Sequence, residues 1–467
     1  MKYQSTRGEA PVLEFSDVLL AGLAVDGGLY VPVEFPTMTS TDLHSLAEMS
    51  YSEVATRVLE PFVSPSIEVD ELGNMIEDSY STFRHPDVVP VKQLPAEIGN
   101  DRYLAELYWG PTFSFKDVAL QLLGRLFEYE LTRRDTGVTI VGATSGDTGS
   151  AAIEACKDRS GIELVMLHPR GRVSEVQRRQ MTTVASPNIH NVAIDGTFDD
   201  CQDLVKAMFS DLQFRERHKL AAVNSINWAR VAAQTVYYFT TAARIAGPNQ
   251  PISFCVPTGN FGNILAGHIA SRMGLPIKRL IIASNHNDIL TRTHSSGVMQ
   301  IRDVEPSTSP AMDIQVSSNF ERLLFDLSDK DSVWLAAAMR DFRSSGSMTL
   351  GKSVAKRIRD LFDADRASEA EVEQEISGLY STQEEFLDPH TAVGVHVIRG
   401  MKLLDSPAAV MATAHPAKFN SVVEAATGVA PPQPAEISGL MRQTERCVDL
   451  PNELSAVMEF VSAASTS

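Results

Sequence analysis

Lys116 is the residue with the clearest potential for covalent chemistry. It lies in the segment GPTFSFKD at residues 110–117, directly before a predicted helix over residues 118–134. Apolar neighbours and the positive end of a helix dipole both disfavour an ammonium ion, so this amine could act as a Schiff-base nucleophile. Taken alone, the segment fits better a lysine that snorkels from a helix start, with Asp117 as the N-terminal carboxylate.

A glycine-rich turn with the sequence VPTGNFGN occupies residues 256–263, between a predicted strand at 252–255 and a predicted helix at 264–272. Glycines allow the backbone N–H groups to form a cup that binds a phosphate together with the helix dipole. The turn lacks the Lys and the Ser/Thr of an ATP loop, so it suits a phosphate held by backbone alone, as on a cofactor. A structural turn explains the pattern equally well. The residues of the predicted cup are Gly259, Asn260, Phe261, Gly262 and Asn263.

A second turn of this kind, with the sequence GATSGDTG at residues 142–149, also joins a predicted strand (138–141) to a predicted helix (150–157). Its hydroxyl and N–H groups could bind a carboxylate, while Asp147 caps the helix or orients a ligand hydroxyl. Helix capping alone is the simpler interpretation. The residues predicted to bind substrate are Thr144, Ser145, Gly146, Asp147, Thr148 and Gly149.

In combination, an imine-forming lysine, a phosphate cup without lysine and a second anion-binding turn indicate pyridoxal 5'-phosphate with an amino-acid substrate. The combination is more specific than any of its parts. The eleven histidines show no HExxH motif or close pairing, so no metal site is predicted.

The elements that must position these residues alternate between short β-branched runs and amphipathic helices from about residue 100 onward. This βαβ alternation predicts an α/β protein with two lobes, each a mostly parallel sheet flanked by helices. The 467-residue chain is long enough for such lobes and a separate N-terminal unit. We expect an N-terminal domain over residues 1–88 and a catalytic region over 89–467, whose smaller lobe, roughly 117–222, is inserted in the larger.

Charge and cysteine content restrict the partners and the compartment. The chain has 41 Lys and Arg against 59 Asp and Glu, a net charge of −18, which disfavours nucleic acid and anionic membranes as partners. Four cysteines without CxxC spacing, no signal peptide pattern and no long apolar run predict a cytoplasmic protein. The sequence leaves open whether it is a monomer or a homo-oligomer.

Over nearly its whole length, the sequence resembles the threonine synthase family of fold type II pyridoxal-phosphate enzymes. Besides the three segments above, the resemblance rests on STRG (5–8), GLA (22–24), GGLYVP (27–32), DGTFD (195–199), NSINW (224–228), SSNFER (317–322), DPH (388–390) and TAHPAKF (413–419). It implies that the chain converts O-phospho-L-homoserine and water to L-threonine and phosphate by β,γ-elimination and replacement.

The resemblance also implies individual roles. Lys116 would carry the cofactor as an imine and serve as the catalytic base, the cup at residues 259–263 would hold the cofactor phosphate, and Thr413 would hydrogen-bond the pyridine nitrogen. The turn at residues 144–149 would receive the substrate's α-carboxylate. The chain departs from many fold type II relatives at Asp147, where they carry Asn, which argues against a direct contact of this side chain with the cofactor's ring oxygen.

Two alternative functions were considered. A serine or threonine dehydratase would share the lysine and both turns, but it needs no site for a substrate phosphate. The segment GSMTLGKS at residues 346–353 matches the ATP-loop pattern and would make Lys352 part of a nucleotide-hydrolysing enzyme, but the helical period of residues 331–343 replaces the strand that such a loop requires. His415 and Lys418 lie near Thr413 and are left outside the predicted site.

Overall fold

The computed structural model describes residues 1–247, 250–402 and 404–465. The N-terminal unit contains a three-stranded antiparallel sheet of order β2-β1-β3 and helices packed beside it. Its elements are β1 (Lys2–Ser5), β2 (Leu13–Glu14), α1 (Phe15–Ala21), β3 (Tyr30–Pro32), α2 (Ser40–Ser45), η1 (Leu46–Glu48), α3 (Tyr51–Val63) and α4 (Val69–Tyr80). The sequence pattern of residues 42–59 predicts a single helical stretch. The structure interrupts this stretch, because Ser50 and Glu53 form a capping box that starts α3 as a separate helix.

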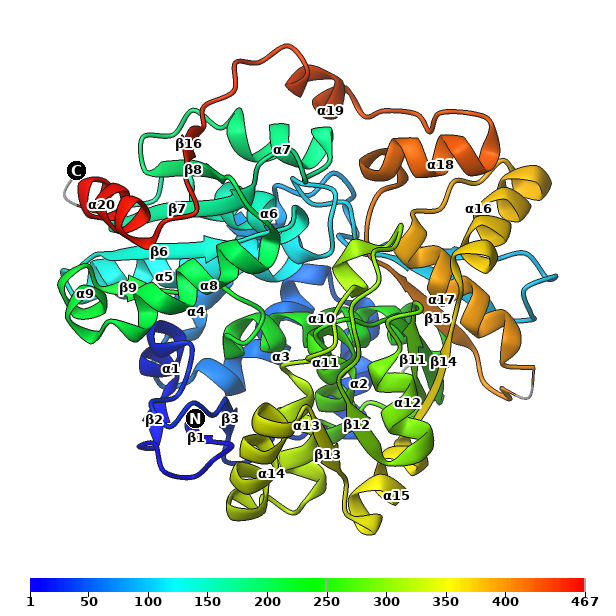
Figure 1. The fold of residues 1–467 in the computed structure, drawn as a ribbon. Helices are drawn as coiled ribbons and strands as arrows, with labels where there is room; N and C mark the ends of the chain where they lie inside the picture. Colours follow the sequence, from blue (N-terminus) through cyan, green and yellow to red (C-terminus); the bar gives the residue numbers. More distant parts are fainter. Residues whose placement is uncertain (248–249, 403, 466–467) are drawn as a thin grey trace.

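A six-stranded sheet of order β14-β11-β10-β15-β5-β4 forms the larger lobe, and only its edge strand β4 (Val91–Gln93) is antiparallel. The other strands are β5 (Arg102–Glu106), β10 (Ile252–Pro257), β11 (Ile277–Ser284), β14 (Phe362–Arg366) and β15 (Ala408–Ala412). Alternate strand residues point to opposite faces, so Phe254 packs into the core with α10 (Trp228–Ile245) and α11 (Gly262–Arg272), while Cys255 faces α17 (Pro389–Gly400). Both faces are therefore covered by helices (Figure 1).

The smaller lobe is a five-stranded parallel sheet of order β16-β8-β7-β6-β9. Its strands are β6 (Val138–Ala143), β7 (Ile162–Pro169), β8 (Ile189–Ile194), β9 (Leu220–Ala221) and β16 (Val448–Leu450). One face carries α5 (Lys116–Arg133) and α6 (Asp147–Cys156), and the other carries α8 (Phe198–Ser210) and α20 (Leu454–Ala464). The C-terminal segment thus returns to this sheet, a pairing that no local pattern indicates (Figure 1).

The remaining elements surround the two sheets. They are α7 (Glu175–Thr182), α9 (Leu212–Arg217), α12 (Ile289–Ser296), β12 (Val298–Gln300), η2 (Pro310–Met312), α13 (Phe320–Leu327), α14 (Ser332–Ser345), β13 (Ser347–Thr349), α15 (Lys352–Leu361), α16 (Glu369–Gln383), η3 (Pro416–Phe419), α18 (Asn420–Thr427) and α19 (Ala435–Leu440). In the described part of the chain, no helix has the length and apolar character needed to cross a bilayer.

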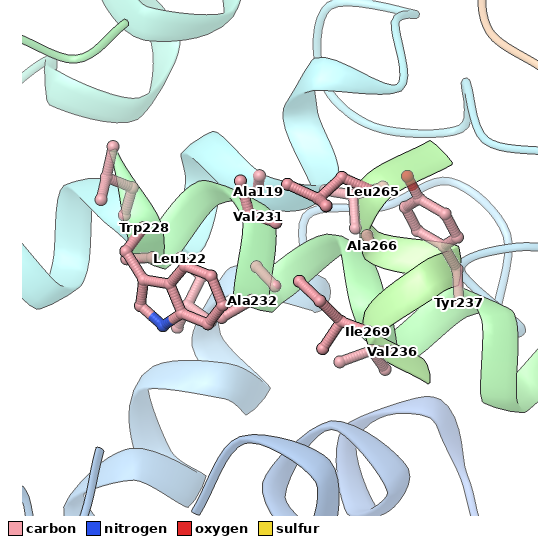
Figure 2. Close-up of a cluster of buried hydrophobic side chains, with 14 of the residues drawn as sticks. Ala119, Leu122, Trp228, Val231, Ala232, Val236, Tyr237, Leu265, Ala266 and Ile269 are labelled. Carbon is pink, nitrogen blue, oxygen red and sulfur yellow. The ribbon is translucent and has the colours of Figure 1, made fainter. Parts of the chain in front are cut away.

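Helix α10 lies at the centre of the molecule, where the lobes and the N-terminal unit share one core. Figure 2 shows apolar side chains of α5, α10 and α11 meeting there, including Leu122, Val236 and Ile269. All three are buried. The predicted α/β architecture with two parallel-sheet lobes is confirmed, and α10 provides a rigid support behind the strand ends.

Residues 346–353 match the sequence pattern of an ATP loop but do not have the structure of one. Gly346 ends α14 rather than a strand, and β13 pairs only with β12 in a small antiparallel ribbon. Lys352 is exposed at the start of α15. Because an ATP loop requires a buried parallel strand before its first glycine, the segment lacks the context for nucleotide binding.

Candidate active site at the carboxyl ends of the parallel strands

The predicted site segments all follow parallel strands at their carboxyl ends. The turn at 144–149 follows β6, the cup at 259–263 follows β10, Thr413 follows β15, and the segment with Lys116 follows β5. In the larger sheet β10, β15 and β5 are neighbours, so three of these segments start side by side. Crevices at the carboxyl ends of parallel strands are where α/β proteins bind ligands.

Lys116 is the first residue of α5 and is held against the segment after β15. Phe115 donates its N–H to the Thr413 carbonyl at 2.8 Å, and His415 donates its N–H to the Phe113 carbonyl at 3.1 Å. Phe113 adopts a left-handed backbone conformation with φ 60°. These bonds hold the segment that precedes Lys116 against the segment that contains Thr413.

The carboxylate of Asp117 stabilises the turn that precedes α5. It accepts hydrogen bonds from the N–H of Thr112 at 2.7 Å and from its hydroxyl at 2.8 Å. Burial raises the pKa of Asp117 to about 6, while the two bonds from Thr112 oppose the rise. Asp117 therefore has a structural role, and the expected N-terminal carboxylate of the helix is directed into the turn rather than to solvent.

The amine of Lys116 is buried and faces charged groups. Its Nζ atom lies 3.7 Å from Oδ2 of Asp147 and 4.8 Å from the centre of the Phe115 ring. Burial lowers the pKa of Lys116, the Asp147 carboxylate opposes this, and the positive charges of Lys418 and Arg230 lower the pKa further. An amine in this environment gives up its proton more readily than an exposed lysine, as a nucleophile or base must.

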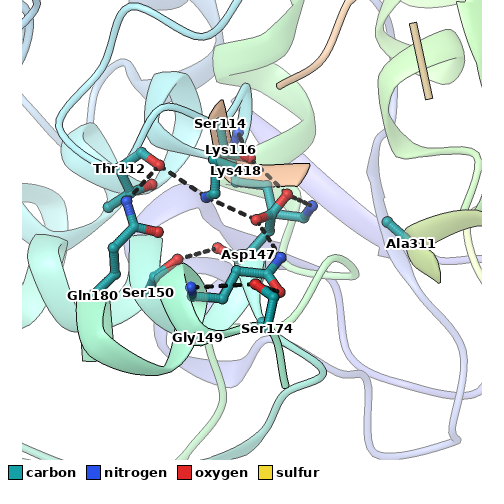
Figure 3. A network of polar contacts seen from close by, with 12 residues as sticks. Thr112, Ser114, Lys116, Asp147, Gly149, Ser150, Ser174, Gln180, Ala311 and Lys418 are labelled. Carbon is teal, nitrogen blue, oxygen red and sulfur yellow. Dashed lines mark hydrogen bonds and ion pairs between the residues drawn. The ribbon is translucent and has the colours of Figure 1, made fainter. Parts of the chain in front are cut away.

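The turn at residues 144–149 reaches the site through Asp147 (Figure 3). The Thr144 hydroxyl accepts the N–H groups of Gly146 at 3.0 Å and Gly149 at 2.8 Å and shapes the turn, and Ser145 is exposed at its tip. Asp147 faces inward, where its Oδ1 accepts hydrogen bonds from Gln177 and Lys418. The side chain is therefore part of a buried network and does more than cap α6.

The cup at residues 259–263 has the features of an anion site built from backbone. Phe261 has φ 64° and precedes the first residue of α11, whose first N–H groups have no partner inside the helix. A Cβ atom on Gly259 would lie 2.5 Å from the carbonyl oxygen of Ala311, so only glycine fits there. The carboxamide of Asn263 accepts hydrogen bonds from Tyr237 and Tyr238, while its buried Nδ2 atom has no partner.

Two cationic residues of this region were not among the predicted site residues. The Lys418 side chain is fully buried, and its Nζ atom donates to the Thr112 carbonyl at 2.8 Å and lies 2.7 Å from Asp147. Arg230, near the start of α10, is 4% exposed and donates to the Val223 carbonyl, while its Nε atom is buried without a partner. Among the described residues no carboxylate pairs with Arg230, and burial lowers its pKa to about 10.

Only the fold reveals these two residues as part of the site. Lys418 lies five residues after Thr413, within the segment TAHPAKF (413–419) that contributes to the family resemblance, and the sequence offers these two signals for it. Arg230 lies in a helical stretch and belongs to no recognisable motif. A single arginine on an otherwise apolar helix is usually predicted to be exposed to solvent.

Comparison with known proteins places this arrangement in a family. Residues 2–80 match the model of the threonine synthase N terminus, residues 84–343 the pyridoxal-phosphate dependent enzyme model, and residues 391–461 the threonine synthase C-terminal model. The chain is 49% identical over 464 residues to threonine synthase of Pseudomonas aeruginosa, covering 99% of this chain and 98% of that protein.

The chain belongs to the threonine synthase family. A crystal structure of PLP-bound threonine synthase from Brucella melitensis is similar over 100% of both chains, with a TM-score of 0.97 and 49% identity. The yeast threonine synthase structure has a TM-score of 0.93 and 36% identity, covering 100% of this chain and 99% of that one. The predicted family, fold and class of enzyme are confirmed.

The residues of the site fit pyridoxal phosphate, the cofactor of this enzyme class. Lys116, a buried lysine with a depressed pKa, would supply the point of covalent attachment. The unpartnered Asn263 Nδ2 atom and the close packing at Gly259 fit a phosphate bound by an amide and by backbone N–H groups. The buried Thr413 follows β15 and lies beside the lysine segment, where a hydroxyl could reach the ring nitrogen.

Proposed function

We propose that this chain is a threonine synthase that converts O-phospho-L-homoserine and water to L-threonine and phosphate. Family membership over the full length supports the activity. The observation that carries the proposal at the level of residues is the buried Lys116 amine, which lies 3.7 Å from Asp147 of the turn at residues 144–149. One turn is assigned to the substrate's α-carboxylate and the other to the cofactor phosphate, so the phosphate of the substrate requires a third anion site.

We assign the cofactor to three parts of the site. Lys116 holds it covalently, residues 259–263 bind its phosphate, and the Thr413 hydroxyl hydrogen-bonds the ring nitrogen. When bound, pyridoxal phosphate supplies an electron sink for carbanions of an amino acid. Because a threonine hydroxyl is neutral, it does not force a proton onto that nitrogen as an aspartate partner would.

We assign substrate binding to the turn at residues 144–149 and to Arg230. The turn at residues 144–149 offers N–H groups at the start of α6 for the α-carboxylate. The unpaired guanidinium of Arg230 is suited to the substrate phosphate, because buried arginine binds phosphate with charge-assisted hydrogen bonds. The charge of Arg230 also lowers the pKa of Lys116, so the guanidinium lies within electrostatic range of the reacting amine.

Lys116 acts as the proton carrier of the reaction. Its free amine takes the proton from Cα and serves the later transfers between Cα, Cβ and Cγ. A proton leaves Cβ as phosphate leaves Cγ with the electron pair of the C–O bond. A proton then completes the Cγ methyl group, water adds its hydroxyl to Cβ, and a proton returns to Cα. Closure of the two lobes around the site would keep other water away from the reacting atoms.

The first experiment traps the cofactor. Borohydride reduction of the purified protein, followed by peptide mass analysis, should place reduced pyridoxal phosphate on Lys116. Phosphate release from O-phospho-L-homoserine with formation of threonine then tests the substrate. A Lys116→Ala variant that turns over without added amine, or a wild-type protein that deaminates threonine and does not consume phosphohomoserine, would contradict the proposal.

We also propose that the enzyme works in the cytoplasm. All four cysteines are free, and three of them are buried thiols, which fits a reducing compartment. Fractionation of cells with antibody detection of the chain would test this location.

A further inference from the structure

The buried carboxylate of Asp147 lies between two lysine amines. Its Oδ1 atom is 2.7 Å from Nζ of Lys418 and its Oδ2 atom is 3.7 Å from Nζ of Lys116. Figure 3 shows the three side chains converging from η3, α5 and α6. One negative charge is therefore shared by two buried positive charges.

The sharing is unequal. Lys418 is fully buried, makes the short contact and has a second acceptor in the Thr112 carbonyl at 2.8 Å. Gln177 donates to the same Oδ1 atom at 2.8 Å. The Lys116 Nζ atom lies 3.7 Å from Asp147, which is beyond hydrogen-bond length. Lys418 therefore neutralises most of the negative charge of Asp147.

We propose that Lys418 is a positioning residue of the reaction: by pairing with Asp147, it prevents this carboxylate from holding the proton of Lys116. The inference rests on the proposed function of Lys116. Without Lys418, the carboxylate would have Lys116 as its only cationic partner and would keep that nitrogen protonated. With Lys418 in place, Asp147 orients the Lys116 nitrogen and leaves the proton free to move.

The surrounding charges agree with these separate roles of Lys418 and Lys116. Burial alone would raise the pKa of Asp147, but the charges of Lys418 and then Lys116 hold it well below its usual range. The charged groups that face Lys116 from neighbouring elements are Asp147 on α6, Lys418 in η3 and Arg230 on α10. Asp117 also interacts with Lys418, but its carboxylate is occupied by two bonds from Thr112.

A pH titration of the visible spectrum of the cofactor-loaded protein tests the inference, because the absorption of the cofactor on Lys116 changes when that nitrogen loses its proton. In Lys418→Met the midpoint should rise by about one pH unit or more, since the carboxylate then faces Lys116 alone. In Asp147→Asn the midpoint should fall. In the double variant, which removes both members of the pair, it should return to within about half a unit of wild type.

The controls separate this inference from the proposed function. Lys206→Met removes a lysine from the exposed pair with Asp203 and should leave the midpoint unchanged. An unchanged midpoint in Lys418→Met, or a double variant that titrates like either single variant, would overturn the role of Lys418. If Lys418→Met does not fold, the double variant decides, because it removes both charges of the Asp147–Lys418 pair together; its failure to fold would also overturn the inference. A wild-type protein without a cofactor band on Lys116 would instead refute the proposed function.

Discussion

At the scale of single residues, Arg230 is a buried arginine that has no ion pair among the described residues and donates only to the Val223 carbonyl, whereas Arg322, which also lacks an ion pair, donates to three oxygens. Arg7, for comparison, is buried in a two-pronged pair with Glu321. A buried unpaired charge is costly, and a protein retains one where a ligand supplies the counter-charge. Arg230 is therefore the strongest candidate for recognition of the substrate phosphate.

Replacement of Arg230 by methionine should reduce kcat/KM for phosphohomoserine by roughly 100-fold, which corresponds to about 3 kcal/mol for a lost charge-assisted bond. The free energy of unfolding should stay constant or increase, because an uncompensated charge leaves the core. Steady-state kinetics and denaturant unfolding measure the two effects. Arg357→Met, in the partly exposed pair with Asp329, serves as the control, and a loss of stability without a kinetic change would contradict the assignment.

The substitution Gly259→Ala tests whether the cup at residues 259–263 binds the cofactor phosphate. The new Cβ atom would collide with the Ala311 carbonyl oxygen, so the loop must move and cofactor affinity should fall at least tenfold. The matched control is Gly378→Ala in α16, where nothing lies within 4 Å and the protein should gain up to about 1 kcal/mol. Titration of the cofactor-free protein with pyridoxal phosphate gives the affinities, and equal values for the two variants would refute the role of the cup.

At the scale of elements, α10 joins several parts of the site. Its start carries Arg230, and one side of its second half carries Tyr237 and Tyr238. The hydroxyl of Tyr238 donates to both the carboxamide and the backbone carbonyl of Asn263 at 2.9 Å. A buried helix with these contacts fixes the start of α11 relative to Arg230, and so it sets the distance between the two proposed anion sites.

Tyr238→Phe should therefore lower the stability by about 1 kcal/mol and weaken cofactor binding, because Asn263 loses a donor that orients it. Tyr380→Phe in α16 is a control on a half-buried tyrosine far along the chain from the cup. Thermal unfolding with and without pyridoxal phosphate measures both effects. Equal stabilisation of both variants by the cofactor would contradict a positioning role for Tyr238.

At the scale of the whole molecule, the N-terminal unit is joined to the catalytic region by buried polar contacts. The Arg7 guanidinium binds both oxygens of Glu321 on α13, and Arg322 donates to the Tyr30 carbonyl at 3.0 Å. The rings of Tyr3 and Phe62 each lie 5.8 Å from Trp228, at the start of α10. The unit thus packs against the helix that carries Arg230.

Arg7→Ala should destabilise the protein by about 3–5 kcal/mol, because Glu321 would be left as a buried charge without its cation. Arg57→Ala, in an exposed pair with Asp42 of the same unit, should cost less than about 1 kcal/mol. Chemical denaturation of both variants measures the difference. If Arg7→Ala proved as stable as Arg57→Ala, the contact between the N-terminal unit and α13 would not contribute to folding.

Local sequence patterns were sufficient for the two-lobed α/β architecture and for the two glycine-rich turns that join a strand to a helix. The reason is that strand and helix periodicity, turn glycines and helix starts depend on residues close together in the chain. The pairing of β16 with β8 was not predicted, because it joins residues more than 250 positions apart in the chain. The interruption at Ser50 was not predicted either, because the capping box ends the helical stretch although the apolar spacing continues.

For the site, the sequence alone indicated that the turns at residues 144–149 and 259–263 each join a strand to a helix. Only the tertiary structure decided that Asp147 faces inward between Lys116 and Lys418, and that Arg230 is buried without a carboxylate. The physical reason is that the charge state and role of a side chain depend on burial and on partners distant in the chain. Residue type and spacing predict neither.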